Sequence, residues 1–183
     1  MKHVITIVVA LSLASCDKKN AITEPQALNA LSFEAAEADV NRYLGNGAEI
    51  VAICGPSVGS VLFVDNGVAK LERDEIKNGV VGFGFDKDGK PDIVRRDAMK
   101  VMIRLSEDGG MVTYNPLSKK KGLGTWTVSY PSTGVAESYV LGKRPDGSVV
   151  SIWTSAKPEI DAMLPPRGLL MFSKCKVVNA QTH

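Results

Sequence analysis

Ser57 is the first residue whose neighbours suggest a reaction, because residues 55–59 read Gly-Pro-Ser-Val-Gly and match the pattern G-x-S-x-G. In that pattern the serine is a nucleophile on a turn between a strand and a helix. Residues 60–64, however, are rich in β-branched and aromatic types and predict a second strand. The two histidines, His3 and His183, lie near the ends of the chain, so a Ser-His-Asp triad lacks a base. We interpret the pattern as a hairpin turn and expect no catalytic residues.

A metal site would need other ligands, because the scarcity of histidine argues against zinc or copper. Asp86, Asp88 and Asp92 resemble the acidic loop of FG-GAP propeller repeats, although Gly84 stands where that loop has its first aspartate. Losing one carboxylate weakens a calcium site. A hairpin loop whose aspartates accept hydrogen bonds from nearby backbone N–H groups would give the same pattern. We expect no metal and no cofactor, with calcium at these three aspartates as the alternative.

The first residues have the order of an export signal: Lys2 supplies a positive charge, and the mostly apolar residues 4–14 follow. The ending Leu13-Ala14-Ser15-Cys16 resembles the lipobox of bacterial lipoproteins, in which the cysteine receives a diacylglyceryl group and the signal is cut before it. The apolar run is shorter than the roughly 20 residues that span a bilayer. We expect residues 1–15 to be removed and Cys16 to anchor the protein outside the cytoplasm, on the periplasmic face of a membrane if the host is Gram-negative. The alternative is an ordinary signal peptide without lipidation.

Two cysteines remain once Cys16 is assigned to lipid. In an oxidising compartment such a pair usually forms a disulfide, so Cys54 and Cys175 are predicted to tie the first core strand to the last. The chain-entropy model assigns a loop of this length about 4–5 kcal/mol of stabilisation. The alternative is two buried free thiols.

The elements that would position these residues change character near residue 47. Residues 16–23 are polar and predict a tether, and apolar residues at helical spacing predict a helix over 24–44 with Thr23 as its N-cap. Further along, Asn-Gly and Asp-Gly pairs supply the positive φ angles of tight turns. Between them lie nine segments rich in β-branched and aromatic residues: 49–54, 60–64, 80–85, 99–105, 111–114, 125–130, 137–141, 149–154 and 169–173.

Short strands at regular spacing predict an antiparallel meander of eight or nine strands, closed as a barrel or folded as a sandwich. The fold class is therefore mainly β with an N-terminal helix. We expect one globular domain over 24–178, with its β part at 48–178 and a tail at 179–183. The 183 residues are 44% hydrophobic, which suits a single core. A formal charge of +2 argues against nucleic acid as the main partner, and the oligomeric state stays open.

Two groups of side chains are candidates for contact with a partner. One is basic and could face anionic lipid or peptidoglycan, although interleaved acidic residues favour a solvated surface of mixed charge. It comprises Arg95, Arg96, Lys100, Arg104 and Lys119 to Lys121. The other is aromatic and either lines a ligand cavity or fills the core, and we expect core packing. It comprises Trp126, Tyr130, Tyr139 and Trp153.

Several short motifs over residues 43–175 resemble a group of small exported bacterial proteins without assigned function. They are Cys54 to Gly59, Asp74-Glu75-Ile76 with Gly79, Asp108-Gly109-Gly110, Glu137-Ser138-Tyr139, Trp153-Thr154 and Leu170 to Cys175. The resemblance implies a shared fold with a cysteine pair and no activity. We expect a non-catalytic, lipid-anchored envelope protein that binds another envelope protein or peptidoglycan. The alternatives are an inhibitor or immunity-type lipoprotein, comparable in architecture to small β-barrel lysozyme inhibitors, and a hydrolase using Ser57.

Overall fold

The computed structural model describes residues 24–65, 68–96, 101–117, 123–158 and 167–178. These ranges contain the helix α1 (Ala30–Leu44) and the strands β1 (Glu49–Asp65), β2 (Val68–Ile76), β3 (Val80–Phe85), β4 (Pro91–Arg96), β5 (Met102–Arg104), β6 (Met111–Pro116), β7 (Gly124–Tyr130), β8 (Val135–Lys143), β9 (Val149–Lys157) and β10 (Arg167–Val177). The protein is mainly β with an N-terminal helix, as predicted. No helix within the described ranges has the length and apolar character needed to cross a membrane.

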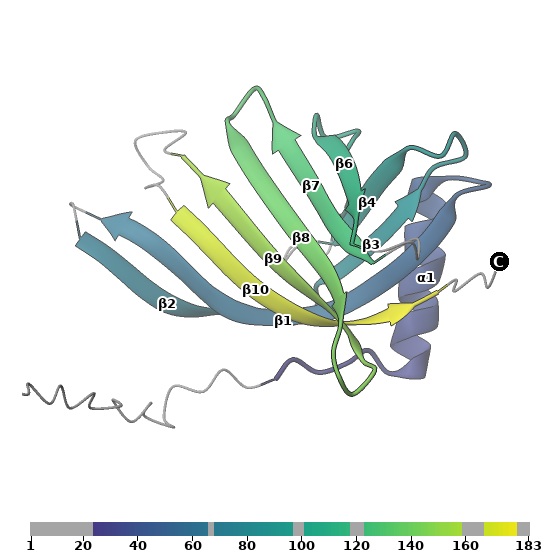
Figure 1. The fold of residues 1–183 in the computed structure, drawn as a ribbon, viewed down its shortest axis with the longest axis horizontal. Coiled ribbons are helices and arrows are strands. Elements are labelled where there is room, and N and C mark those ends of the chain that lie inside the picture. Colours follow the sequence, from purple (N-terminus) through teal and green to yellow (C-terminus); the bar gives the residue numbers. More distant parts are fainter. Residues whose placement is uncertain (1–23, 66–67, 97–100, 118–122, 159–166, 179–183) are drawn as a thin grey trace, which may run out of the picture.

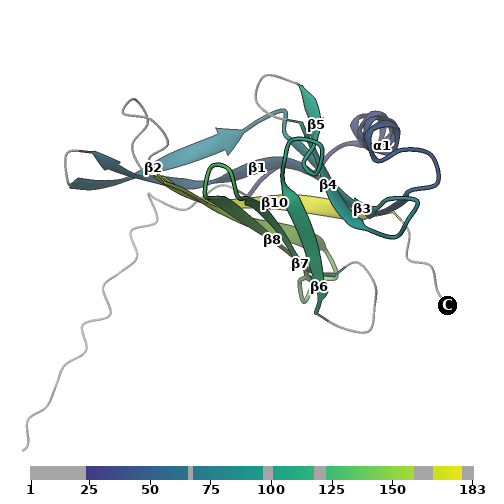
Figure 2. The same cartoon turned by 90° about the horizontal axis from the view of Figure 1, so that it is seen from above.

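All the strands belong to one antiparallel sheet of ten strands. Nine follow the order β5-β4-β3-β1-β10-β9-β8-β7-β6, and β2 pairs with β1 alone. The sheet curls into a half-barrel, with α1 against the outside of one end (Figures 1 and 2). The expectation of a barrel or a sandwich therefore resolves into a single curled sheet that does not close completely.

β1 runs through both halves of this sheet. Its first part pairs with β3 and its second part with β2, while β10 pairs along its other edge through both parts. The sequence predicted two strands separated by a turn at residues 55–59, and this was wrong. The register with β10 shifts between Cys54 and Ser57, so a bulge holds the irregular residues, including Pro56, within the strand.

The disulfide lies at the point where β1 changes partners. Cys54 and Cys175 are directly opposite each other in the β1–β10 pairing and are bonded, although 121 residues separate them in sequence. The predicted link between the first and last core strands is confirmed. It joins the two strands that both halves of the sheet share.

The helix begins later than the sequence predicted. The expected start at residue 24 was wrong, because α1 starts at Ala30 and Asn29 is its N-cap. The Asn29 side chain accepts a hydrogen bond from the backbone N–H of Ser32, which is the usual action of an N-cap asparagine. The predicted cap, Thr23, lies outside the described residues.

Residues 24–29 are extended and pack on the sheet instead of forming a helical turn. The carboxylate of Glu24 forms ion pairs with Arg144 and Lys174, which belong to the distant end of the chain. The next residue, Pro25, is buried. These contacts to the sheet replace the local hydrogen bonds that a helix starting at residue 24 would have made.

Glycines let α1 approach the outer face of the sheet. A Cβ on Gly82 would lie 2.5 Å from the Val40 side chain, and one on Gly84 would lie 2.6 Å from Leu44. The helix and sheet together bury one hydrophobic cluster, made of Phe33, Ala36, Val40, Leu44, Ile50, Ile53, Val80, Val94 and Met102. This cluster fixes α1 against the outer face of the sheet at one end of the half-barrel.

A second cluster fills the inside of the curl at the same end. Phe83 packs against both Trp126 and Tyr139, with ring centroids 5.6 and 5.5 Å apart. Trp126 and Tyr139 are fully buried; the expected core packing is confirmed for Trp126, whereas Tyr139 packs in the core and also borders a cavity. Tyr130 and Trp153 are only partly buried. One end of the half-barrel is therefore packed solid.

Two strands were not predicted. In β2, residues 71–75 read Leu-Glu-Arg-Asp-Glu, and the side chains of this strand are mostly exposed, so no hydrophobic alternation marks it. Charged side chains are common on edge strands, where they discourage pairing with other chains. β4 begins at Pro91, directly after the Asp-rich segment, and that acidic pattern led us to expect a loop.

Candidate functional site

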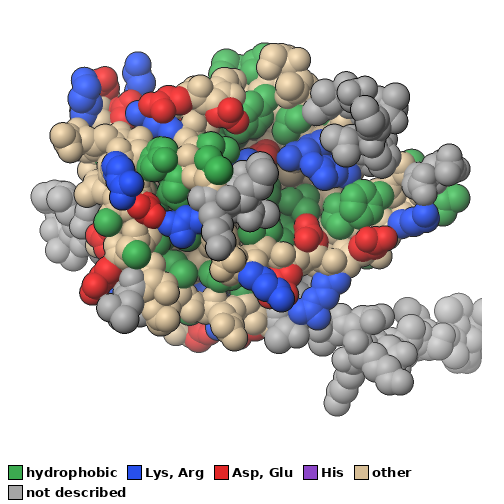
Figure 3. All heavy atoms as spheres, turned by 180° about the vertical axis from the view of Figure 1, so that it is seen from behind, with side chains coloured by type: hydrophobic (Ala, Val, Ile, Leu, Met, Phe, Trp, Pro, Cys, Tyr) green, Lys and Arg blue, Asp and Glu red, His purple; other side chains and the backbone are tan. Residues whose placement is uncertain are grey.

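The open half of the half-barrel contains a cavity of about 540 Å³ on the inner face of the sheet. Its apolar lining is formed by Val61, Phe63, Ile76, Val81, Tyr139, Trp153, Leu169 and Met171. Small-molecule sites in proteins have this size and combine an apolar lining with a few polar groups. From behind, hydrophobic side chains are seen among Lys, Arg, Asp and Glu side chains (Figure 3).

One face of β9 presents hydrogen-bond donors to this cavity. Ser151, Trp153, Ser155 and Lys157 alternate along the strand and all line the cavity. Ser155 is 5% exposed, and its hydroxyl has no hydrogen-bond partner in the described part of the chain. The buried indole N–H of Trp153 likewise has none there. Because buried polar groups are nearly always hydrogen-bonded, these two are candidates for ligand contact.

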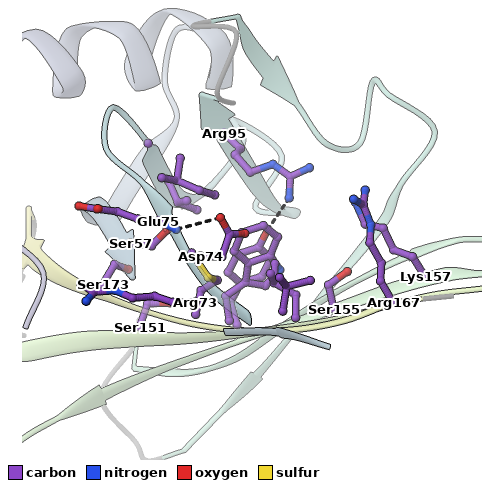
Figure 4. A pocket seen from close by; sticks show the side chains of 18 of the residues that line it. Ser57, Arg73, Asp74, Glu75, Arg95, Ser151, Ser155, Lys157, Arg167 and Ser173 are labelled. Carbon is purple, nitrogen blue, oxygen red and sulfur yellow. Dashed lines mark hydrogen bonds between the residues drawn. The ribbon is translucent and has the colours of Figure 1, made fainter. Parts of the chain in front are cut away.

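Two cations stand together beside Ser155. Lys157 of β9 is directly opposite Arg167 of β10, and the two side chains lie side by side at the edge of the cavity, where Lys157 is partly buried and Arg167 is exposed (Figure 4). Neither forms an ion pair with a carboxylate among the described residues. Burial lowers the pKa of the Lys157 amine and the charge of Arg167 lowers it further, whereas Glu137 opposes the change. Like charges facing each other across a strand pair are destabilising, so this arrangement has a folding cost.

The back wall of the cavity holds a satisfied polar cluster. Arg95 donates to the Glu137 carboxylate at 2.6 Å and to the Tyr139 hydroxyl at 2.9 Å, and Tyr139 donates to Glu137 at 2.7 Å. Burial opposes the charge on Arg95, but the neighbouring Tyr139 and Glu137 raise the pKa of the guanidinium above its ordinary value. Arg95 also lies over the Trp153 ring, 5.2 Å from its centroid. These contacts fix the aromatic wall in place.

The opposite wall carries carboxylates. Glu72 and Asp74 lie on β2, opposite Val61 and Gly59 of β1, and both line the cavity. Asp74 accepts a hydrogen bond from the backbone N–H of its neighbour Glu75. Arg73 of the same strand also lines the cavity, so the cations on β9 and β10 face a β2 wall of mixed charge.

Ser57, the candidate nucleophile, lies on the cavity wall opposite Ser173 of β10. The strand before it was expected, but β1 continues past it to Asp65 where a nucleophile elbow would have a helix. No histidine occurs in the described residues. Ser57 therefore lacks the strand-turn-helix setting that the G-x-S-x-G pattern requires.

The aspartates of the candidate calcium loop accept hydrogen bonds from other groups of the protein. The Asp86 carboxylate accepts the backbone N–H groups of Asp88 and Lys90, as in the expected hairpin loop. Asp92 is buried and accepts hydrogen bonds from Arg104 and the Ser106 hydroxyl. Among the described residues no three His, Cys, Asp or Glu side chains form a group that could hold a metal ion.

The described arginines do not form the basic face that the sequence suggested. Arg95 pairs with Glu137 inside the curl, whereas Arg96 pairs with Asp39 of α1 on the outer side. Successive residues of β4 thus point to opposite faces. Lys100, residues 119–121 and the predicted lipidation site Cys16 all lie outside the described residues.

Sequence reasoning missed Ser155, Lys157 and Arg167. The alternation of donors in residues 151–157 was a usable signal, because it places four polar or amphipathic side chains on one face of a strand. Arg167 could not be joined to them without the β9–β10 register. A scan against protein-family models, a search of curated proteins and a search of solved structures each found no match.

Proposed function

We propose that this protein is a non-catalytic binding protein of the cell envelope, anchored to a membrane by lipid at Cys16, whose cavity holds another envelope component. The observation that carries the proposal is a cavity of about 540 Å³ with a buried, unpartnered hydroxyl, that of Ser155, on its wall. Leaving a buried donor unsatisfied costs about 1–3 kcal/mol. A ligand that accepts a hydrogen bond from Ser155 would remove this cost.

The location outside the cytoplasm is supported by two independent features. The Cys54–Cys175 disulfide fits an oxidising compartment, because cytosolic reductants keep most thiols reduced. The order of residues 1–16 fits an export signal with a lipobox-like ending. Replacement of Cys16 by serine is expected to move the protein from the membrane fraction to the soluble fraction of its host. Unchanged membrane association of Cys16→Ser would contradict the anchor.

Binding is supported over catalysis by how the polar groups of the cavity are held. Arg95 and Glu137 are locked in one ion pair, and Tyr139 donates to the same carboxylate. The pKa of Tyr139 is raised well above its ordinary value, chiefly by burial, which keeps its hydroxyl protonated. Groups held in this way suit the orientation of a ligand better than the movement of a proton.

The test uses two adjacent residues of β10 that face opposite sides of the sheet. Leu169 lines the cavity, whereas Leu170 is 55% exposed and lies on the outer face. A photoreactive amino acid would be placed at either position in the full chain, in its own host. We expect irradiation to give a covalent adduct from position 169, identified by mass spectrometry of the purified protein.

Position 170 is the matched control, because it shares the strand and the membrane location with position 169. An adduct from position 170 alone would place the partner on the outer face and contradict the proposal. The absence of any adduct at both positions would also contradict it. Competition by a compound that binds the purified protein should remove the adduct at position 169.

A further inference from the structure

The side chains on the wall formed by β9 and β10 favour one chemical class of ligand. This inference rests on the proposed binding function and specifies its ligand. Lys157 and Arg167 form a cross-strand pair of like charge at one end of the cavity. Such a pair destabilises the folded state unless something negative lies between the two groups. Glu137, the nearest acidic residue in the strand register, attracts Lys157 and opposes the lowering of its pKa, but its carboxylate is bound by Arg95 and Tyr139 and forms no ion pair with either cation.

Ser155 supplies an independent observation at the same place. It is two residues before Lys157, so both side chains lie on the inner face of β9. Its hydroxyl is buried without a partner in the described part of the chain and points toward the two cations (Figure 4). An oxygen of a phosphate or carboxylate would accept from this hydroxyl and from both cations together.

The rest of the cavity is apolar next to this group. Leu169 lies two residues from Arg167 along β10 and opposite Ser155, and Met171 and Trp153 form the next pair along the same strands. A ligand whose anionic group binds the two cations would therefore place its adjoining part directly against an apolar surface. A free inorganic anion would leave that surface unused.

We propose that the cavity binds an anionic amphiphile, with its phosphate or carboxylate between Lys157, Arg167 and Ser155 and its apolar part along Leu169, Met171 and Trp153. Anionic phospholipids and fatty acids have this chemistry, and so do phosphorylated lipid carriers. Because Lys157 and Arg167 lie together at one end of the cavity, the ligand is expected to carry its negative charge at one end.

The test measures binding to the full chain with Cys16→Ser by calorimetry, at detergent concentrations below micelle formation. Dodecyl phosphate is the probe, dodecyl maltoside is the neutral amphiphile with the same alkyl chain, and inorganic phosphate is the anion without one. We expect dodecyl phosphate to bind about tenfold or more tighter than dodecyl maltoside, since charge-assisted hydrogen bonds contribute at least that factor. It should also bind more tightly than inorganic phosphate, because only dodecyl phosphate buries an alkyl chain. Lys157→Met and Arg167→Met should each remove about tenfold of this affinity, and Lys143→Met, at an exposed position away from the cavity, should not change it.

The outcomes separate this inference from the proposed function. Equal binding of dodecyl phosphate and dodecyl maltoside, insensitive to Lys157→Met, would overturn the anionic preference and leave a binding cavity. Equal binding of inorganic phosphate and dodecyl phosphate would overturn the apolar part of the assignment. If no probe binds while position 169 still gives its adduct, the amphiphile is wrong and the proposed function stands. A circular dichroism spectrum of each variant establishes that it is folded.

Discussion

The guanidinium of Arg95 on β4 lies 2.6 Å from the carboxylate of Glu137 on β8, across the inside of the curled sheet. These strands are not neighbours, because β3, β1, β10 and β9 lie between them in the strand order. The Glu137 side chain is 1% exposed. The pair therefore fixes how tightly the sheet curls, in a place where no backbone hydrogen bond does so.

Removal of one member of this pair should be strongly destabilising. Arg95→Met leaves the Glu137 carboxylate buried without its cation, for which we expect a loss of about 3–5 kcal/mol in the free energy of unfolding. Urea denaturation measures it. Arg42→Met is the matched control, because Arg42 pairs with Asp39 at the surface, and it should cost less than about 1 kcal/mol. Equal losses for the two variants would show that the buried pair has no special role.

Reduction of the disulfide should destabilise the protein without abolishing the β1–β10 pairing. The chain-entropy model gives about 4–5 kcal/mol for a loop of this length. We expect Cys54→Ala/Cys175→Ala to unfold at a lower urea concentration than the wild type, and addition of a reductant to lower the wild-type midpoint to that of the variant. A wild-type midpoint that does not respond to complete reduction would contradict this prediction.

Gly59 is expected to tolerate no side chain. A Cβ there would lie 1.9 Å from the backbone oxygen of Leu170 and 2.8 Å from the Cα of Met171. Gly59→Ala must therefore separate β1 from β10 and should lower the melting temperature by several degrees, at roughly 4 °C or less per kcal/mol for a chain of this size. Gly142→Ala is the control, because nothing lies within 4 Å of its position. A Gly59→Ala protein as stable as Gly142→Ala would contradict the close approach.

Lys157 should make stability depend on pH in a defined direction. Its pKa is lowered from 10.5 chiefly by burial, which outweighs the opposing attraction of Glu137, so the folded protein releases this proton at a lower pH than the unfolded chain does. The penalty for the charged amine is complete below the folded pKa and fades as the pH rises toward 10.5. Lys157→Met should therefore melt at or above the wild-type temperature at pH 7, and the difference should shrink at alkaline pH. A lower melting temperature at pH 7 would be the opposite result.

The sequence predicted features whose causes are local or chemical. Cysteine pairing followed from the expected compartment and from the number of cysteines, and it is present as Cys54–Cys175. Gly47, Gly89, Gly109 and Gly147 of the Asn-Gly and Asp-Gly pairs have the positive φ expected of them, whereas Gly79 does not and Gly67 lies outside the described residues. In these cases one or two residues are enough to predict the structural feature.

The sequence could not predict features that depend on pairing between distant segments. The two halves of β1 looked like separate strands because Gly55 and Pro56 interrupt the apolar pattern, and only the bulge against β10 makes them continuous. The meeting of Lys157 and Arg167 likewise depends on the β9–β10 register. A shift of one residue would have turned one of them to the outer face.

Because β1 and β10 pair on both sides of the disulfide, they form a common spine for the packed end and the hollow end. A protein that consists of two rigid bodies can open at a hinge between them. The described residues of this protein contain no such hinge. We therefore expect the backbone of β1 and β10 to be nearly the same in the protein with and without a bound ligand.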